Sequence, residues 1–508
     1  MNTKSFENVG ACFDFIFDEF SNKAAIFLEK ENKEITYLQL KKKVDLIINI
    51  FVLNKYKKGD ICIIFNDKSL LGIASIIACI YLGIVFVNLD NESPIKRLEK
   101  IFMKCKPKFF INLICSDNKI NILKNKFDFI TLEINDRKLN DFKEFQIVDK
   151  PNLDAPLYVM FTSGSTGFPK GAIISHENLL NFVDWAQKEF NINEFDRFTN
   201  INPIYFDNTI FDFFVSLLSG ACLVPFSKED LINPLELLKK VNYSKCTIWF
   251  SVPSLLVYLI RLRILDSKYF YNLRLIIFGG EPFPKKHLKE IFEKMNQYLT
   301  LVNVYGPTEC TCICSSHKIV KSDFLNMNNF APLGNLAESY KFYIDPKNQK
   351  DPNTGELILI GPCVGKGYIN DNEITKKVFL KIKNKFGNEE IGYKTGDIVS
   401  VDKNGKILFI SRIDNQIKNM GYRIELGEIE AAAYNIDDVF EAAAIFNKID
   451  SDIGIIKLFI SGKPGLNINK IRKNIESQLP KYMIPKFISI MKELPKNANG
   501  KIDRKSLI

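Results

Sequence analysis

The stretch Leu157 to Gly171, LYVMFTSGSTGFPKG, joins an apolar run typical of a buried strand to a loop that is dense in hydroxyls and glycines. Glycines allow backbone conformations that other residues avoid, the hydroxyls supply hydrogen-bond donors, and the lysine supplies a cation. This combination predicts an anion-binding loop at the end of a strand. The residues expected to form it are Thr162, Ser163, Gly164, Ser165, Thr166, Gly167 and Lys170.

The loop differs from the phosphate-binding loop of P-loop NTPases. That pattern places a glycine directly before the lysine and Ser or Thr directly after it. Here Pro169 precedes Lys170 and Gly171 follows it. The loop therefore predicts another kind of phosphate site, and a polar turn between two strands is the alternative for the loop taken alone.

Four further motifs follow the loop along the chain. They are Asn303 to Glu309 (NVYGPTE), Tyr393 to Asp397 (YKTGD), Arg412 to Glu425 (RIDNQIKNMGYRIE) and Asn499 to Arg504 (NGKIDR). With this ordered set the chain resembles the adenylate-forming superfamily. Within it, the chain is similar to the amino-acid adenylation domains of nonribosomal peptide synthetases and to stand-alone D-alanine carrier-protein ligases. Weaker matches at 35–37, 83–94, 355–368 and 479–485 extend the resemblance over nearly all 508 residues.

Composition limits the class of protein. A chain of 508 residues, 46% of them hydrophobic, exceeds what one core normally serves, so we expect at least two domains. The net charge of +10 comes from 69 basic against 59 acidic residues, but the basic residues are dispersed along the chain. No run resembles a nucleic-acid surface, so we predict no nucleic-acid partner.

Neither a secretion signal nor a membrane span is expected. The N-terminus mixes acidic residues with apolar ones, so we expect the protein to stay in the cytoplasm. The most apolar stretch, Leu70 to Val87, is interrupted by glycines and indicates helix, turn and strand rather than a membrane helix. The eleven cysteines are scattered, so we expect no disulfides. Cys310, Cys312 and Cys314 alternate as on one face of a strand, and no second ligand pair suggests a metal there.

Short β-branched runs alternate with amphipathic helices, as at Leu273 to Phe278, Lys285 to Met295 and Leu301 to Val304. This alternation predicts a layered α/β fold. The resemblance implies a large N-terminal adenylate-forming domain of sheets and helices over residues 1–412. It also implies a small, mobile α+β C-terminal domain over residues 413–508, with a hinge near Asp414.

Activating a carboxylate with ATP builds negative charge at the α-phosphate, so cations must be present there. The resemblance implies that Lys501 bridges the α-phosphate and the substrate carboxylate, although a solvated lysine on a C-terminal turn is the alternative. It implies further that Thr308 contacts the α-phosphate. Glu309 matches the family ligand of Mg²⁺, a cation that prefers oxygen.

The resemblance also assigns the remaining nucleotide contacts. Asn303 and Tyr305 would contact adenine, and Asp397 would bind the ribose hydroxyls. Arg412 would lie near the ribose and is expected to be one of the catalytic residues. The backbone and side chains of Gly280, Val304, Gly306 and Pro307 complete the ATP site. For Tyr305 a core aromatic, and for Asp397 a turn residue, are the alternatives.

Asp207 indicates the class of substrate. A carboxylate in an apolar pocket is costly unless it meets a cation, and the resemblance pairs this position with the ammonium group of an amino acid. The other residues that align with the pocket are Asn208, Phe211, Phe250, Ile277, Gly279, Val304, Cys312 and Ile313. The lining is apolar and partly bulky, so we expect a small or medium aliphatic amino acid, of the Ile/Val or the Ala/D-Ala type.

In a second half-reaction the family rotates the small domain, which would turn Gly421 and Arg423 toward the site and admit a phosphopantetheine thiol. Because the sequence ends four residues after Arg504, we expect the carrier protein to act in trans. Ser411 and Asn88 depart from the family pattern, where glycine and proline are usual. An acyl-CoA synthetase of the same fold and a non-catalytic adenylate-binding protein are the alternatives.

Overall fold

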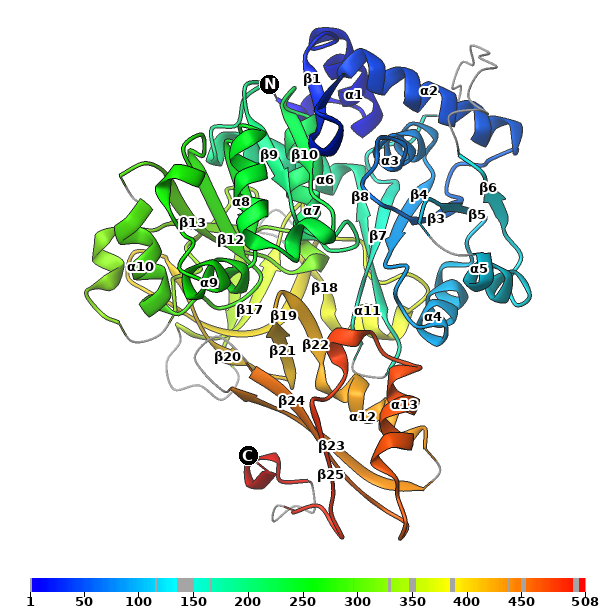
Figure 1. Cartoon of the computed structure of the whole chain (residues 1–508), viewed down its shortest axis with the longest axis vertical. Helices are drawn as coiled ribbons and strands as arrows, with labels where there is room; N and C mark the ends of the chain where they lie inside the picture. The colour runs from blue at the N-terminus through cyan, green and yellow to red at the C-terminus, as the bar shows by residue number, and fades with distance from the viewer. Residues whose placement is uncertain are drawn as a thin grey trace.

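The computed structural model describes residues 2–114, 117–134, 150–164, 167–295, 297–327, 330–346, 353–383, 389–436, 438–448, 454–496 and 502–507. A large N-terminal domain, blue to yellow in Figure 1, lies above a small C-terminal domain, orange to red. This is the mixed α/β architecture that the alternation of strands and helices predicts.

A first sheet of the large domain carries the strand that begins the LYVMFTSGSTGFPKG stretch. Its order is β6-β5-β3-β4-β7-β8, with parallel neighbours except for the antiparallel pair β7 and β8. The bounds are β3 Ile61–Phe65, β4 Val85–Leu89, β5 Phe109–Asn112, β6 Ile130–Leu132, β7 Pro156–Thr162 and β8 Lys170–Ser175. Continuous apolar runs such as Ile61–Phe65 suit strands buried on both faces.

A second, larger sheet lies beside the first, in order β15-β14-β13-β12-β11-β9-β10-β1-β2. The bounds are β1 Ala24–Leu28, β2 Lys33–Thr36, β9 Arg197–Asn200, β10 Cys222–Pro225, β11 Ile248–Ser251, β12 Leu275–Gly279, β13 Thr300–Tyr305, β14 Ser315–Lys318 and β15 Asn335–Leu336. Its central strands are parallel, so loops at their carboxyl ends gather at one edge.

The helices of the large domain lie on these sheets (Figure 1). Their bounds are α1 Val9–Glu19, α2 Tyr37–Leu53, α3 Leu70–Leu82, α4 Ile95–Cys105, α5 Asp117–Lys124, α6 His176–Glu189, α7 Asn208–Ile210, α8 Pro234–Tyr243, α9 Pro253–Arg261, α10 Lys285–Met295 and α11 Asn372–Val378. Ser69 caps α3, and Gly83 ends it with φ 63°, before β4. The prediction of helix, turn and strand over Leu70 to Val87 is therefore confirmed.

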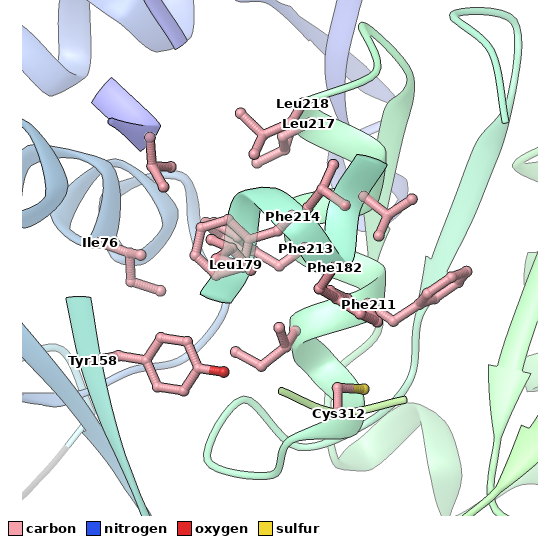
Figure 2. Packing of buried hydrophobic residues seen from close by; sticks show 14 of the residues in the cluster. Ile76, Tyr158, Leu179, Phe182, Phe211, Phe213, Phe214, Leu217, Leu218 and Cys312 are labelled. Atoms are coloured by element: carbon pink, nitrogen blue, oxygen red, sulfur yellow. The ribbon is translucent and has the colours of Figure 1, made fainter. Parts of the chain in front are cut away.

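Both sheets share one core. Figure 2 shows Tyr158 reaching from β7 toward the π-helical turn Phe211–Val215, which follows α7. Phe86 of β4 lies between Tyr158 and Phe214, with ring centroids 5.5 Å and 6.4 Å away. This packing fixes the loop after β7 relative to the segment around α7, and both segments carry predicted site residues.

A third, antiparallel sheet connects the large domain to the small one. Its bounds are β16 Lys341–Asp345, β17 Thr354–Ile360, β18 Phe379–Lys383, β19 Glu389–Val401 and β20 Ile407–Arg412. Ser411 pairs with Ile398 of β19 near the end of β20. Three residues, among them Asp414, separate β20 from the next strand.

The small domain packs α12 Leu426–Tyr434 and α13 Ile468–Glu476 on a sheet of β23 Val439–Lys448, β24 Gly454–Gly462 and β25 Phe487–Ile490. Its core, with Ile429, Leu458 and Ile475, is a cluster separate from those of the large domain. A hairpin of β21 Gln416–Asn419 and β22 Tyr422–Glu425 projects against the large domain. There Tyr422 stacks on Tyr482 at 3.8 Å and meets Phe206 at 5.0 Å.

The prediction of a strand through Cys310, Cys312 and Cys314 is wrong. Cys310 ends a 3-10 turn, and Thr311 and Cys312 have φ of 53° and 75°, because the chain folds back against Gly306. The cysteines within the described residues are buried free thiols, and no group of three or more metal-ligating side chains occurs in that part of the chain. Of the helices in the described ranges, none is long and apolar enough to span a membrane.

Candidate active site

The predicted anion-binding loop joins β7 to β8, and Thr162 and Lys170 face each other where the two strands meet it. Gly164 is required there because a Cβ atom would lie 1.9 Å from the carbonyl oxygen of Phe168. Gly167 has φ 79°, in the left-handed region that favours glycine. The sequence pattern thus reflects a tight turn, closed by a hydrogen bond from the Gly167 amide to the Gly164 carbonyl oxygen at 3.0 Å.

The hydrogen-bond donors of this loop differ in whether they have a partner. Thr162 Oγ1 is buried, has no hydrogen-bond partner among the described residues, and belongs to a side chain that lines a cavity. The Ser163 hydroxyl donates to the carbonyl oxygen of Arg423 at 2.7 Å, and the Gly164 amide donates to Glu428 at 3.1 Å. A bound phosphate oxygen would satisfy the unpartnered hydroxyl. Ser165 and Thr166 lie outside the described residues.

Residues expected to bind the nucleoside converge from β13, β19 and β20. The Tyr305 hydroxyl donates to Asp397 at 2.5 Å, and Arg412 donates to the other oxygen of Asp397 at 2.7 Å. Arg412 also forms a two-pronged ion pair with Asp414 at 2.7 and 2.8 Å. Burial alone would lower the pKa of Arg412, but the two carboxylates outweigh it and raise the pKa. Asn303 is buried and donates to Pro332.

Two adjoining cavities open beside this cluster. One, of about 200 Å³, is lined by Asn303, Tyr305, Asp397 and Arg412 among others. The second, of about 70 Å³, shares the last three of these and continues to Asp207. The other residues assigned to the nucleotide, Gly280, Val304, Gly306, Pro307 and Thr308, line one or both cavities.

Glu309 lies fully buried beside the second cavity. It accepts hydrogen bonds from the Tyr368 hydroxyl at 2.6 Å and from Arg423 at 2.8 Å. Burial by itself would raise the pKa of Glu309, but Arg423 and Tyr368 outweigh it and bring the pKa to about 2. The carboxylate is thus ionised, as a magnesium ligand must be, and a single carboxylate with phosphate oxygens is a common Mg²⁺ donor set.

Asp207 lies at the start of α7 and accepts a hydrogen bond from the Thr308 hydroxyl at 2.5 Å. Burial raises the pKa of Asp207, and the hydrogen bond from Thr308 offsets part of that effect. Within the described part of the chain, no cation lies within ion-pair distance of this carboxylate. The second cavity therefore contains a carboxylate for which a ligand ammonium is the natural partner.

The structure separates the predicted pocket residues into two groups. Asn208, Phe250, Val304, Cys312 and Ile313 line the second cavity. Phe211, Ile277 and Gly279 lie behind this lining: Phe211 meets Phe250 edge-on at 5.4 Å, and Gly279 packs against Val304. Figure 2 shows Phe211 directed into the shared core.

Lys418 was not among the predicted site residues, yet it lines both cavities. Its ammonium lies 5.8 Å from the centre of the Tyr305 ring, and burial lowers its pKa. Lys418 pairs across the hairpin with Arg423. The sequence contained a signal for this role, because Lys418 and Arg423 both lie in the motif Arg412 to Glu425 and share one face of a two-stranded ribbon.

Lys501 lies outside the described residues, and so does Asn499 in the same motif. The residues after it attach to the small domain: Arg504 pairs with Glu430 of α12 at 2.7 Å, and Leu507 joins a cluster with Ile445. Figure 1 marks the C-terminus beside the small domain, below the large one. The hairpin β21–β22, and not this C-terminal segment, faces the cavities.

Comparison with known proteins identifies the family. The chain matches the model of the AMP-binding enzyme over residues 16–369 and that of the AMP-binding enzyme C-terminal domain over residues 428–501. It is 32% identical to Surfactin synthase subunit 2 of Bacillus subtilis over the whole chain, which spans 14% of that protein. It is 30% identical to the D-alanine--D-alanyl carrier protein ligase of Listeria monocytogenes, covering 94% of both chains.

Solved structures share the fold. The Vibrio cholerae adenylation domain AlmE in complex with glycyl-adenosine-5'-phosphate superposes with a TM-score of 0.81 at 22% identity, covering 98% of this chain and 96% of that one. The holo form of PA1221, an NRPS protein described as containing adenylation and PCP domains, superposes with a TM-score of 0.84 at 21% identity. The match covers 99% of this chain and 84% of that one. The matched models and the end-to-end likeness to the carrier protein ligases place this chain in the AMP-binding enzyme family, as an adenylate-forming ligase.

Proposed function

We propose that this ligase activates a small or medium aliphatic amino acid and loads it on a carrier protein. In the first step the amino-acid carboxylate attacks the α-phosphorus of ATP, forming aminoacyl-AMP and releasing pyrophosphate. In the second step a phosphopantetheine thiol attacks the acyl carbon, forming the thioester and releasing AMP. The thiol proton leaves in this step, so charge balances.

The observation that carries this proposal is Asp207. Its carboxylate is buried at the second cavity with one hydroxyl donor, Thr308, and with no cation at ion-pair distance in the described residues. A buried carboxylate costs several kcal/mol until it is paired. The α-ammonium of an amino acid would pair it, whereas an organic acid without an amine would not.

The cavity favours an aliphatic side chain. Phe250, Val304, Cys312 and Ile313, which the resemblance assigns to the substrate side chain, line the cavity and carry no charge. A charged side chain there would lose its hydration without gaining a partner. Valine, isoleucine, alanine and D-alanine fit this lining, and one methylene group changes the binding free energy by only about 1–3 kcal/mol.

The nucleotide would occupy the first cavity. Tyr305 would stack on adenine. Asp397 would accept hydrogen bonds from the ribose hydroxyls, because it lines the first cavity together with its ion-pair partner Arg412. Thr162 offers its unpartnered hydroxyl to a phosphate oxygen. Thr308 would contact the α-phosphate once its hydroxyl, which now donates to Asp207, is released. Lys501 would neutralise charge that develops at the α-phosphate. Glu309 would hold Mg²⁺, which screens the charge of the β- and γ-phosphates when bound.

The arrangement of the two domains supports the second step. Gly421 and Arg423 face the site, and Arg504 and Leu507, which follow Lys501 in the chain, pack on the small domain. We infer that Asp414, between β20 and β21, is the hinge about which the small domain exchanges these two faces. Relatives named carrier protein ligases support a phosphopantetheine carrier as the acceptor.

The test is amino-acid-dependent exchange of labelled pyrophosphate into ATP, run with Mg²⁺ across the proteinogenic amino acids and D-alanine. Exchange with one or a few aliphatic amino acids is expected. Exchange with organic acids alone would favour an acyl-CoA synthetase; o-succinylbenzoate CoA synthetase shares this fold at a TM-score of 0.84 and 20% identity. No exchange with any acid, together with tight adenylate binding, would favour a non-catalytic binding protein.

A further inference from the structure

A second buried carboxylate lies behind the pocket that contains Asp207. Asp212 follows it along the chain, in the π-helical turn Phe211–Val215 (Figure 2). Asp212 is fully buried and does not line either cavity. Burial raises the pKa of the Cys312 thiol, and the charges of Asp207 and Asp212 raise it further. Both carboxylates therefore lie close to a residue that lines the second cavity.

Asp212 is connected through two amides to two segments that form this pocket. Asn202 Nδ2 donates to Asp212 Oδ2 at 3.0 Å and to the main-chain carbonyl oxygen of Phe250, also at 3.0 Å. Asn200 Nδ2 donates to the same carboxylate oxygen at 3.4 Å and to the Thr209 hydroxyl at 3.0 Å. Thr209 lies in α7, the short helix that follows the expected ammonium-binding residue. The carboxylate thus joins that helix to the cavity wall at Phe250.

Lys68 holds the same region from the side of the first sheet. It follows β3 and has φ 62°. Its ammonium donates at 2.7, 3.2 and 3.0 Å to the main-chain carbonyl oxygens of Asn200, Ile201 and Phe226. These carbonyls lie at the ends of β9 and β10. The strand end that carries the two asparagines is therefore fixed by Lys68 on one side and by Asp212 on the other.

Stability alone does not account for a carboxylate at this position. Burial raises the pKa of Asp212 to about 8, and the hydrogen bond from Asn202 and the charge of Lys68 offset only part of that effect. The second oxygen, Oδ1, is buried and has no hydrogen-bond partner among the described residues. Apolar residues in place of buried ionic groups are often neutral or stabilising, whereas a polar network can specify a single arrangement. The network is therefore better suited to fixing a distance than to adding stability.

We propose that Asp212 is a positioning residue that fixes the distance between Asp207 and the cavity wall at Phe250. The inference rests on the proposed binding of an amino acid and adds to it what sets the accepted length of the side chain. The substrate ammonium would be held at Asp207, and the aliphatic side chain would end against Phe250. Because a misplacement of about 1 Å can change a rate by about 10²-fold, the distance between these two residues determines which side chain is used best.

The test compares kcat/KM in pyrophosphate exchange for alanine, D-alanine, valine and isoleucine, on the full chain with ATP and Mg²⁺. Asp212→Ala removes the acceptor of both amides, so the ratio between the best and the second-best substrate is expected to fall toward one by about tenfold. Asp212→Asn keeps a carbonyl oxygen that can accept from both amides, so its ratio should stay near the wild-type value. The KM for ATP should not change, because Asp212, Asn202 and Phe250 do not line the first cavity.

Two further variants separate positioning from stability. Asn202→Ala removes the connection to Phe250 and should also lower the ratio, so the proposal stays testable if Asp212→Ala does not fold. Asp196→Ala is the matched control, because Asp196 is a buried carboxylate that precedes the opposite end of β9 and pairs with Arg274. It should lower the thermal midpoint but leave the ratio at the wild-type value.

A ratio that falls in Asp212→Ala and Asn202→Ala, but not in Asp212→Asn or Asp196→Ala, would support the positioning role. If the first two variants lose thermal stability like the control but keep the wild-type ratio, the proposal is overturned. If the wild type exchanges only with organic acids, the proposed amino-acid substrate fails, and the same ratio over a series of straight-chain organic acids decides the role of Asp212. If no acid supports exchange, both proposals fail.

Discussion

Arg423 of the small domain and Glu309 of the large domain form an ion pair of 2.8 Å in which the carboxylate is fully buried. The two residues are 114 positions apart, and the pair joins the hairpin β21–β22 to the 3-10 turn after β13. Breaking a buried pair leaves an uncompensated charge, so this contact couples the position of the small domain to the electrostatics of the site.

This pair should make stability depend on pH in the acidic range. The pKa of Glu309 falls from 4.5 to about 2 in the folded chain, so its contribution is fully present above about pH 5 and is lost as the pH falls toward 2. The shift corresponds to about 3 kcal/mol of unfolding free energy. Urea unfolding of wild type and Glu309→Gln at pH 6 and pH 3.5 should show a difference that shrinks at the lower pH. A difference in unfolding free energy that stays constant with pH would contradict the lowered pKa of Glu309.

Asp207→Asn should abolish activation of amino acids while leaving the nucleoside site intact. The asparagine keeps the hydrogen bond with Thr308 but leaves the substrate ammonium without a counter-charge in a buried site. Losing one partner of such a pair costs about 2–5 kcal/mol, so kcat/KM in pyrophosphate exchange should drop by on the order of 10² or more. AMP affinity, measured by calorimetry, should stay at the wild-type value. Normal exchange with the amino-acid substrate in this variant would show that Asp207 does not bind the ammonium.

Local pattern was enough to predict the segments whose structure depends on near neighbours. The hydroxyl- and glycine-rich loop lies between β7 and β8, and the helix, turn and strand predicted over Leu70 to Val87 are present, with Ser69 capping α3. The motifs around Tyr305 and Asp397 meet in space, as the resemblance implies. These features follow from turn geometry, capping and the edge of a parallel sheet.

Prediction failed where distant parts of the chain decide the conformation. Alternation around Cys312 suggested a strand, but the segment turns because it must pass against Gly306, where a Cβ atom would lie 2.2 Å from the Cys312 carbonyl oxygen. Lys418 and Glu428 enter the site only through the placement of the small domain. The Gly164–Glu428 contact spans 264 positions, and no local periodicity encodes such a pairing.

Lys501→Ala should separate the two half-reactions. Removing a group that stabilises transition-state charge typically costs about 10²–10³ in rate, so pyrophosphate exchange should fall by that order. Transfer from preformed aminoacyl-AMP to a phosphopantetheine thiol should continue at nearly the wild-type rate, because the hairpin with Arg423 faces the site in the arrangement described for that step. Lys486→Ala, an exposed lysine of the same domain, is the matched control and should change neither rate. Equal losses of rate in both half-reactions would contradict the assignment of Lys501 to the adenylation step alone.

Phe250 should set the size of the accepted side chain. It lines the second cavity from β11, and Phe250→Leu removes part of the ring, so preference should shift toward larger aliphatic amino acids. A change of one or two methylene equivalents corresponds to about 10-fold or more in the ratio of kcat/KM values. Phe211→Leu is the matched control, because Phe211 meets Phe250 edge-on from behind and does not line the cavity. It should lower the thermal midpoint by losing buried contacts but change the preference less. If the two variants shift the preference equally, the cavity wall lies elsewhere than at Phe250.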